Sequence, residues 1–131
     1  MSEIFSCEMA VRDYECDMQG VVNNAVYQHY LEHARHEFLK FRGLDFARLT
    51  ADGIIVVVVR AEIDYRISLR SGDVFDVTVV PEQLSPLRLA FRQQIRHKDG
   101  RVMLDALITT TAVNERGRPW FPDELRALLT H

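Results

Sequence analysis

The chain has 131 residues, of which 47% are hydrophobic and 27% are charged, and its formal net charge is −3. This length fits a single domain over residues 1–131, and this apolar fraction can form a core without disulfides or metals. The mild excess of acidic residues argues against a nucleic-acid-binding protein, a class that usually carries a basic face.

The first third of the chain predicts a strand, a loop and a long helix. Residues 3–11 alternate loosely between apolar and polar side chains, as a strand does, and residues 12–24 mix charges, a glycine and asparagines, as a loop does. From Asn24 to about Arg42, apolar side chains recur every three or four residues, which indicates an amphipathic helix of about five turns. Asn23 or Asn24 caps its start, and Gly43 ends it.

The two sides of this helix differ in composition. We expect the apolar side to pack in the core and the polar side to face solvent. The expected core aromatics are Tyr27, Tyr30, Phe38 and Phe41, and the polar side holds Gln28, Glu32, Arg35, Glu37 and Lys40.

The rest of the chain predicts strands between two short helical segments. These segments are expected over Leu44–Thr50 and Pro122–Leu129. Ile54–Val59 is a continuous β-branched run, which predicts a strand buried on both faces at the centre of the sheet. Alternating apolar residues continue to Ile67 and recur over 75–79, 87–95 and 102–110, with turns at Ser71–Asp73 and Lys98–Gly100.

One strand, a long helix and four antiparallel strands predict an α+β fold in which an antiparallel sheet wraps around one long central helix. Such a sheet leaves an exposed edge strand, whose free N–H and C=O groups need covering. A second subunit is the simplest cover, so we expect a homo-oligomer.

The segment from Asp17 to Asn24 carries the candidate chemistry. Acids at positions 13, 15 and 17 precede Gly20, which permits a tight turn, and two asparagines then lead into the helix. A helix start presents unpaired N–H groups and a partial positive charge, which can polarise a carbonyl oxygen while a nearby carboxylate acts on the carbonyl carbon. A simpler interpretation is that the acids only complement the helix dipole and solvate a loop.

The order of residues in this segment adds to the pattern. Asp-x-x-Gly-Val-Val-Asn-x-x-x-Tyr, which runs from Asp17 to Tyr27, resembles the 4-hydroxybenzoyl-CoA thioesterase branch of the hotdog superfamily. The longer run from Val11 through Tyr27 to His33-x-Arg35-His36-Glu37 is similar to plant acyl-lipid thioesterases of the methylketone-synthase-2 type. The resemblance implies a hotdog fold and a hydrolase that cleaves acyl-CoA or acyl carrier protein thioesters of medium- or long-chain fatty acyl or 3-ketoacyl groups.

The resemblance also implies roles for single residues. Asp17 would be the nucleophile or the general base, and the backbone N–H of Asn24 would hold the thioester oxygen. The sites of this family lie at the dimer interface of a homodimer or homotetramer, and we expect no metal and no cofactor. The expected substrate contacts are Gly20, Val22, Asn23, Asn24, Tyr27 and Arg60. Arg60 is chosen because it directly follows a strand expected to be buried, and it would meet the phosphates of CoA or the acidic face of a carrier protein.

The same residues allow other interpretations. His29-Tyr30-Leu31-Glu32-His33 matches the H-x-x-E-H pattern of zinc peptidases, although a solvated helix face explains it more simply. A non-catalytic acyl-thioester-binding protein and an aryl-CoA thioesterase are alternatives to a fatty acyl thioesterase. A hotdog dehydratase would need a paired histidine and acid, for which His97 and His131 are poorly placed.

The cysteines and the chain start bear on location. Cys7 and Cys16 form no C-x-x-C pair and are expected to be free thiols in a reducing compartment. The first residues carry an acid where a signal peptide has a basic and then an apolar region, and no stretch is long enough to span a bilayer. We therefore expect a cytoplasmic protein without membrane or nucleic-acid partners.

Overall fold

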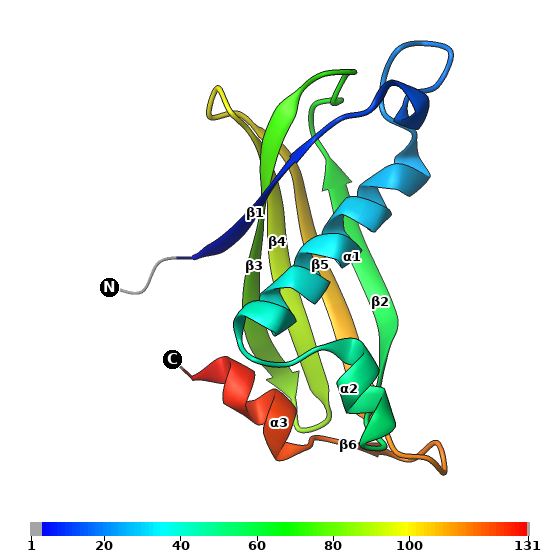
Figure 1. Ribbon diagram of the computed structural model, residues 1–131, viewed down its shortest axis with the longest axis vertical. Helices are drawn as coiled ribbons and strands as arrows, with labels where there is room; N and C mark the ends of the chain where they lie inside the picture. The colour runs from blue at the N-terminus through cyan, green and yellow to red at the C-terminus, as the bar shows by residue number, and fades with distance from the viewer. Residues whose placement is uncertain (1–3, 131) are drawn as a thin grey trace.

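A long helix, α1 (Asn24–Phe41), lies across one face of an antiparallel sheet in the computed structural model, which describes residues 4–130 (Figure 1). The strands follow the order β1-β3-β4-β5-β2, and a short strand, β6, pairs with β5. The strands are β1 Phe5–Ala10, β2 Ile55–Tyr65, β3 Val74–Ser85, β4 Arg88–His97, β5 Val102–Val113 and β6 Pro119–Trp120. The shorter helices are α2 Phe46–Ala51 and α3 Asp123–Arg126, with 3-10 turns at Asp13–Glu15 and Ala127–Leu129.

This arrangement confirms the expected α+β fold, in which one antiparallel sheet surrounds one long helix. The turns at Ser71–Asp73 and Lys98–Gly100 lie between strands as predicted, and both short helical segments are present. Residue 3, the predicted start of the first strand, lies outside the described residues. The strand β6 was not predicted, because a strand of this length is too short to show a periodicity.

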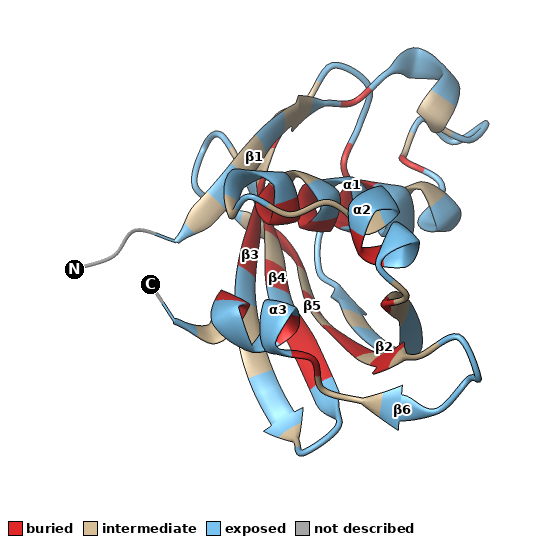
Figure 2. Ribbon diagram, turned by 60° about the horizontal axis from the view of Figure 1, so that its bottom comes forward, coloured by how far each residue is buried: buried red, intermediate tan, exposed pale blue. Residues whose placement is uncertain are grey.

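The buried residues line the space between α1 and the sheet (Figure 2). Two aromatic pairs cross this space: Tyr30 and Phe75 have ring centroids 4.9 Å apart, and Phe38 and Phe91 have centroids 6.4 Å apart. Burial of each such side chain contributes roughly 1.5–3 kcal/mol to stability. Packing against the sheet therefore determines where α1 lies.

Two positions of α1 depart from the predicted division into an apolar and a polar side. Phe41, predicted to be a core residue, is 72% exposed, because it lies in the last turn of α1. Its ring still contacts Phe5 of the edge strand β1. Arg35, predicted to face solvent, is buried with 6% of its surface exposed. It follows Leu31 by one helical turn and therefore shares the face that meets the sheet.

Buried hydrogen bonds connect this face of α1 to the middle of the sheet. Gln93 of β4 accepts a hydrogen bond from Arg35 Nη1 at 3.0 Å, and its Nε2 donates to Leu31 O at 3.0 Å. Gln93 is fully buried, and a hydrogen bond made away from water is costly to lose. This side chain therefore fixes the helix to β4.

The β-branched run Ile54–Val59 does not lie at the sheet centre, so that prediction is wrong. Its strand, β2, is the last in the strand order and is paired only with β5 among the described strands. Val57, Val58 and Val59 are 38%, 51% and 44% exposed. A continuous apolar run indicates that both faces of a strand are covered, but it cannot indicate which chain supplies the cover.

Glu15 fastens the loop between β1 and α1 to the helix. Its Oε1 accepts a hydrogen bond from Tyr30 Oη at 2.7 Å and another from Arg12 N–H at 2.9 Å. Burial, and then the hydrogen bond to this carboxylate, raise the pKa of the Tyr30 phenol. One interpretation of the sequence was that the acids of this loop only complement the helix dipole and solvate the loop, but Glu15 is a structural contact.

Replacing Gln93 with methionine removes both of its hydrogen bonds at nearly constant volume. We expect the free energy of unfolding to fall by about 2–4 kcal/mol, because Arg35 and the Leu31 carbonyl lose a buried partner. Urea denaturation followed by circular dichroism measures the change. Gln83→Met, at an exposed position of β3, is the matched control and should cost less than about 0.5 kcal/mol. Equal losses in the two variants would contradict the role given to Gln93.

The raised pKa of Tyr30 predicts a loss of stability at alkaline pH. The phenol in the unfolded chain ionises near pH about 10, whereas the buried one stays protonated, so its contribution is complete below that pH and is lost as the pH rises. Tyr30→Phe should therefore reduce the fall in unfolding free energy between pH 9 and pH 11.5 relative to wild type, as measured by urea denaturation. Tyr14→Phe, at an exposed position, should leave that fall unchanged.

Candidate active site

The residues predicted to carry the chemistry form a small hairpin before α1. Cys16 and Val22 are paired in an antiparallel bridge, and Asp17 N–H donates to Val21 O at 2.9 Å. Gly20 N–H donates to Asp17 O at 3.0 Å and closes a turn in which Gly20 has a φ of 80°, a conformation that glycine adopts without strain. The hairpin places Asp17 opposite Val21, three residues before the first residue of α1.

The carboxylate of Asp17 is oriented on one side and free on the other. Its Oδ1 accepts a hydrogen bond from Gln19 N–H at 2.9 Å, and Val21 N–H lies 3.5 Å from the same oxygen. Within residues 4–130, Oδ2 has no hydrogen-bond partner, and the side chain is exposed. One oxygen therefore sets the orientation, and the other is available to water or to a substrate.

The start of α1 presents a free main-chain donor at the end of the same hairpin. Asn23 N–H donates to Glu15 O at 3.0 Å, and the Asn23 side chain caps the helix by accepting from Ala25 N–H at 3.0 Å. In the described part of the chain, the N–H of Asn24, the first residue of α1, has no acceptor. Such an amide carries part of the positive helix dipole and can bind a negatively charged oxygen.

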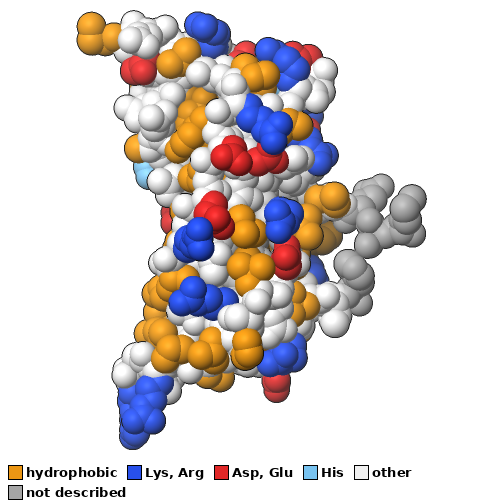
Figure 3. Space-filling view, turned by 180° about the vertical axis from the view of Figure 1, so that it is seen from behind, with side chains coloured by type: hydrophobic (Ala, Val, Ile, Leu, Met, Phe, Trp, Pro, Cys, Tyr) orange, Lys and Arg blue, Asp and Glu red, His pale blue; other side chains and the backbone are white. Residues whose placement is uncertain are grey.

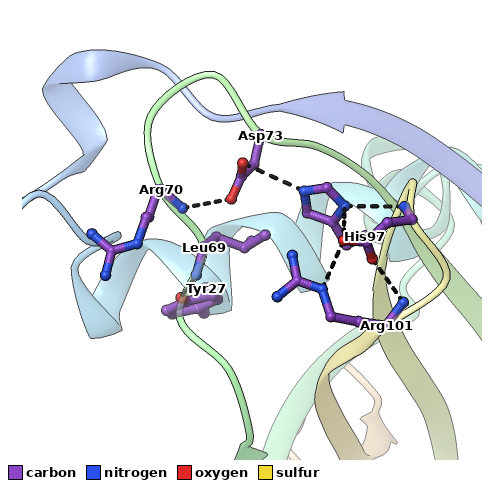
Figure 4. A network of polar contacts seen from close by, with 7 residues as sticks. Tyr27, Leu69, Arg70, Asp73, His97 and Arg101 are labelled. Atoms are coloured by element: carbon purple, nitrogen blue, oxygen red, sulfur yellow. Dashed lines mark hydrogen bonds and ion pairs between the residues drawn. The ribbon is translucent and has the colours of Figure 1, made fainter.

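The connection between β2 and β3 supports this hairpin. Val21 is bridged to Arg70, and Val22 N–H donates to Leu69 O at 2.9 Å. Leu69 N–H donates in turn to Tyr27 Oη at 2.9 Å (Figure 4). Main-chain hydrogen bonds thus join the hairpin to the connection, and the Tyr27 hydroxyl joins the connection to α1.

A polar network completes this connection at the end next to β3 (Figure 4). Asp73 Oδ2 accepts a hydrogen bond from Arg70 N–H at 2.8 Å, and Asp73 Oδ1 lies 3.4 Å from His97 Nε2. His97 Nδ1 also accepts from Asp99 N–H at 3.1 Å. The turn between β4 and β5 is therefore tied to the same support as the hairpin.

The predicted substrate contacts fall into two groups. Asp17 and Gly20 lie in the hairpin, and Asn23 and Asn24 follow it directly at the start of α1. Val22, at the end of the hairpin, and Tyr27 are buried; Leu69 O accepts from the Val22 amide, and Leu69 N–H donates to the Tyr27 hydroxyl. Burial raises the pKa of the Tyr27 phenol, and the hydrogen bond from Leu69 partly offsets this.

Arg60 is not brought to the hairpin of its own chain. Its side chain lies in the middle of β2, is exposed, and forms an ion pair with Glu62 at 3.0 Å. The residue of β2 that contacts Tyr27 is Tyr65, with ring centroids 5.4 Å apart. At the rise of a strand, Arg60 lies about 16 Å before Tyr65 along β2.

A cleft between α1 and the edge strand begins next to the hairpin. The helix side of the cleft is lined by Ala25, Gln28, His29, Glu32 and Arg35, and the sheet side by Val58, Ala61 and Ile108. Ala25 lies in the first turn of α1, so the cleft opens beside the Asn24 amide. The cleft was not predicted from the sequence, although a charged residue at helical spacing from Leu31 and Phe38 was a signal for it.

The histidines of the H-x-x-E-H pattern lie at or near this cleft. His29 and Glu32 line it, whereas His33 Nε2 lies 3.9 Å from Glu37 Oε1. Among residues 4–130, no group of three or more His, Cys, Asp or Glu side chains is placed to hold a metal ion.

The opposite face of the sheet carries mixed charges. Figure 3 shows this face, with acidic and basic side chains interspersed across its middle. Ion pairs join Arg66 Nε to Asp105 Oδ2 at 2.6 Å and Arg92 to Glu82 at 3.1 Å. An apolar ligand therefore finds a better wall in the cleft beside α1 than on this face.

Two further expectations concern thiols and membranes. Cys7 and Cys16 are free and partly buried, and burial raises the pKa of the Cys7 thiol. None of the helices between residues 4 and 130 has the length and apolar character of a membrane-spanning segment.

Comparisons with known proteins agree with the fold. The sequence profile of the thioesterase-like superfamily matches residues 11–129. The chloroplastic acyl-acyl carrier protein thioesterase ATL3 of Arabidopsis thaliana is 34% identical over 133 residues, which covers 100% of this chain and 70% of that protein. The long-chain acyl-CoA thioesterase FadM of Escherichia coli is 34% identical over 108 residues, 82% of this chain and 81% of the relative.

The fold also matches a solved structure closely. A hypothetical protein from Aquifex aeolicus superposes with a TM-score of 0.89 at 30% identity, and the match covers 96% of this chain and 99% of that one. The chain therefore belongs to the thioesterase-like superfamily, has the hotdog fold expected from its sequence, and is a thioester hydrolase.

Proposed function

We propose that the protein hydrolyses medium- or long-chain fatty acyl thioesters of CoA or acyl carrier protein, with Asp17 as its catalytic residue. The observation that carries the proposal is the hairpin from Cys16 to Val22. It presents the Asp17 carboxylate with one oxygen held and the other free, and it leads into the free amide of Asn24.

The two groups suit the two ends of a polarised carbonyl. The Asn24 N–H donates a hydrogen bond to the thioester oxygen, where negative charge develops as the carbon is attacked. Asp17 either attacks the carbon itself or removes a proton from the attacking water. If Asp17 attacks, the C–S bond breaks to leave a mixed anhydride on Asp17, which water then hydrolyses to release the carboxylic acid. If Asp17 acts as the base, the hydroxyl of water adds to the carbon, the C–S bond breaks, and Asp17 returns the proton to the leaving thiolate. Either route consumes one water and yields a carboxylic acid and a thiol.

The cleft and the relatives support a fatty acyl substrate. The cleft runs along α1 from Ala25, the residue after Asn24, and has an apolar wall of Val58, Ala61 and Ile108, which fits an extended acyl chain better than a compact aromatic ring. Relatives above 30% identity are named as an acyl carrier protein thioesterase and a long-chain acyl-CoA thioesterase. The names of both relatives favour a fatty acyl thioester as the substrate of this protein.

We further propose that the protein forms a homodimer through the edge strand β2, either alone or as half of a homotetramer. Val57, Val58 and Val59 expose an apolar row on a strand whose outer edge is unpaired within the described chain. A second copy pairing with β2 would cover this row and would place its own residues over the cleft. Arg60, too far from its own Asp17, would then be available to the phosphates of CoA bound at the partner's site.

Replacing Asp17 with asparagine tests the catalytic assignment. We expect kcat to fall by about 10²–10⁴-fold with the fold retained, because the amide can neither attack nor accept the proton. Thiol release from a panel of acyl-CoA and acyl carrier protein substrates measures it. Asp52→Asn, at an exposed position after α2, should keep wild-type turnover. Full activity in Asp17→Asn would remove Asp17 from the mechanism, and tight binding without hydrolysis by wild type would favour a non-catalytic binding protein.

A charge on the exposed row of β2 tests the dimer. Val58→Lys should shift the protein toward monomer by at least about tenfold in dissociation constant, since a buried lysine would lack a partner in the interface. Light scattering coupled to size-exclusion chromatography gives the mass of the species. Val80→Lys, an exposed valine of β3, is the control and should elute as wild type does. A wild-type monomer, or an unchanged mass in Val58→Lys, would argue against pairing through β2.

A further inference from the structure

The cleft between α1 and β2 ends at a buried positive charge. Arg35 lines the cleft, although only 6% of its surface is exposed. Its Nη1 donates to the amide oxygen of Gln93 at 3.0 Å. Within residues 4–130, its other guanidinium N–H groups have no acceptor, and no carboxylate forms an ion pair with it.

The free N–H groups of this arginine are not sealed in the core, so they are open to a partner that enters the cleft. A guanidinium has several N–H donors and stays charged in proteins. Burial lowers the pKa of Arg35, and the charge of Glu32 on the same helix raises it in part. Burying an ion without an opposite charge costs several kcal/mol, so proteins normally pair it or complete its hydrogen bonds.

Helix packing alone does not require this charge. Gln93 already reaches the helix by donating to Leu31 O, and the neighbouring residues on this face, such as Leu31 and Phe38, are apolar. An uncharged side chain at position 35 would continue that face without the cost of burying an ion. The charge next to a cleft therefore points to a ligand.

The cleft extends from Ala25, the residue after Asn24, to this charge. Its helix residues from Ala25 to Arg35 are spaced by three or four and share one face of α1. At the rise of an α-helix, Arg35 lies about 16 Å along the axis from Asn24. An acyl group held at the Asn24 amide and extended along α1 would pass the apolar wall and meet the guanidinium at its far end.

We propose that Arg35 binds a carboxylate at the far end of the acyl group, so that the protein prefers thioesters of long-chain dicarboxylic acids. The inference rests on the proposed function, because it takes the thioester to be held at Asn24. A carboxylate would accept two parallel hydrogen bonds from the guanidinium and neutralise its charge. The methyl end of an ordinary fatty acyl chain would leave Arg35 unpaired.

Two substrates that differ only at the far end test this preference. We expect wild-type kcat/KM to be about 10- to 100-fold higher for dodecanedioyl-CoA than for dodecanoyl-CoA, as charged hydrogen bonds warrant. Arg35→Met should bring the ratio near one, and Arg35→Lys should recover part of it. Arg118→Met, an exposed arginine between β5 and β6, is the matched control and should keep the wild-type ratio. A wild-type ratio near one overturns the inference, even if the Arg35 variants fail to fold.

A binding measurement separates this inference from the proposed function. If wild type hydrolyses neither thioester, the proposed function has failed. Calorimetric titration with free dodecanedioate and dodecanoate then decides the role of Arg35. Tighter binding of the dicarboxylate to wild type than to Arg35→Met supports a carboxylate site at the end of the cleft, whereas equal binding of both acids to wild type overturns it.

Discussion

The packing of α1 against the sheet is the constraint on which the rest of the structure depends. Tyr30 contacts Phe75 across this interface, and Gln93 donates a hydrogen bond to the main chain of Leu31. A close-packed interior allows few alternative arrangements, so these contacts determine where the helix begins. The hairpin before the helix and the cleft beside it take their positions from that point.

The proposed chemistry depends on the main chain as much as on side chains. The carboxylate of Asp17 is oriented by amides of its own turn, and the oxygen-binding group at Asn24 is itself an amide. Donors that are already fixed need no rearrangement when charge develops on a substrate. Glu15 adds to this rigidity, because its carboxylate fastens the loop to Tyr30 in the core.

The edge strand and the cleft suggest that one chain is incomplete by itself. The apolar row Val57–Val59 is exposed on the strand that forms one wall of the cleft. Covering that row would also enclose the cleft, so assembly and substrate binding would be coupled through the same residues. The buried charge of Arg35 at the end of the cleft would then act in a site shielded from water, where an ion pair is strongest.

The sequence by itself determined the features that depend on neighbouring residues. The cap at Asn23, the end of α1 at Gly43 and the Asp17–Asn24 segment are all local, so their patterns could be recognised along the chain. Only the tertiary structure decided that the Ile54–Val59 strand lies at an edge and that Arg35 is buried. Those outcomes depend on contacts between residues far apart in the chain, and periodicity shows which side of an element is apolar but not what covers it.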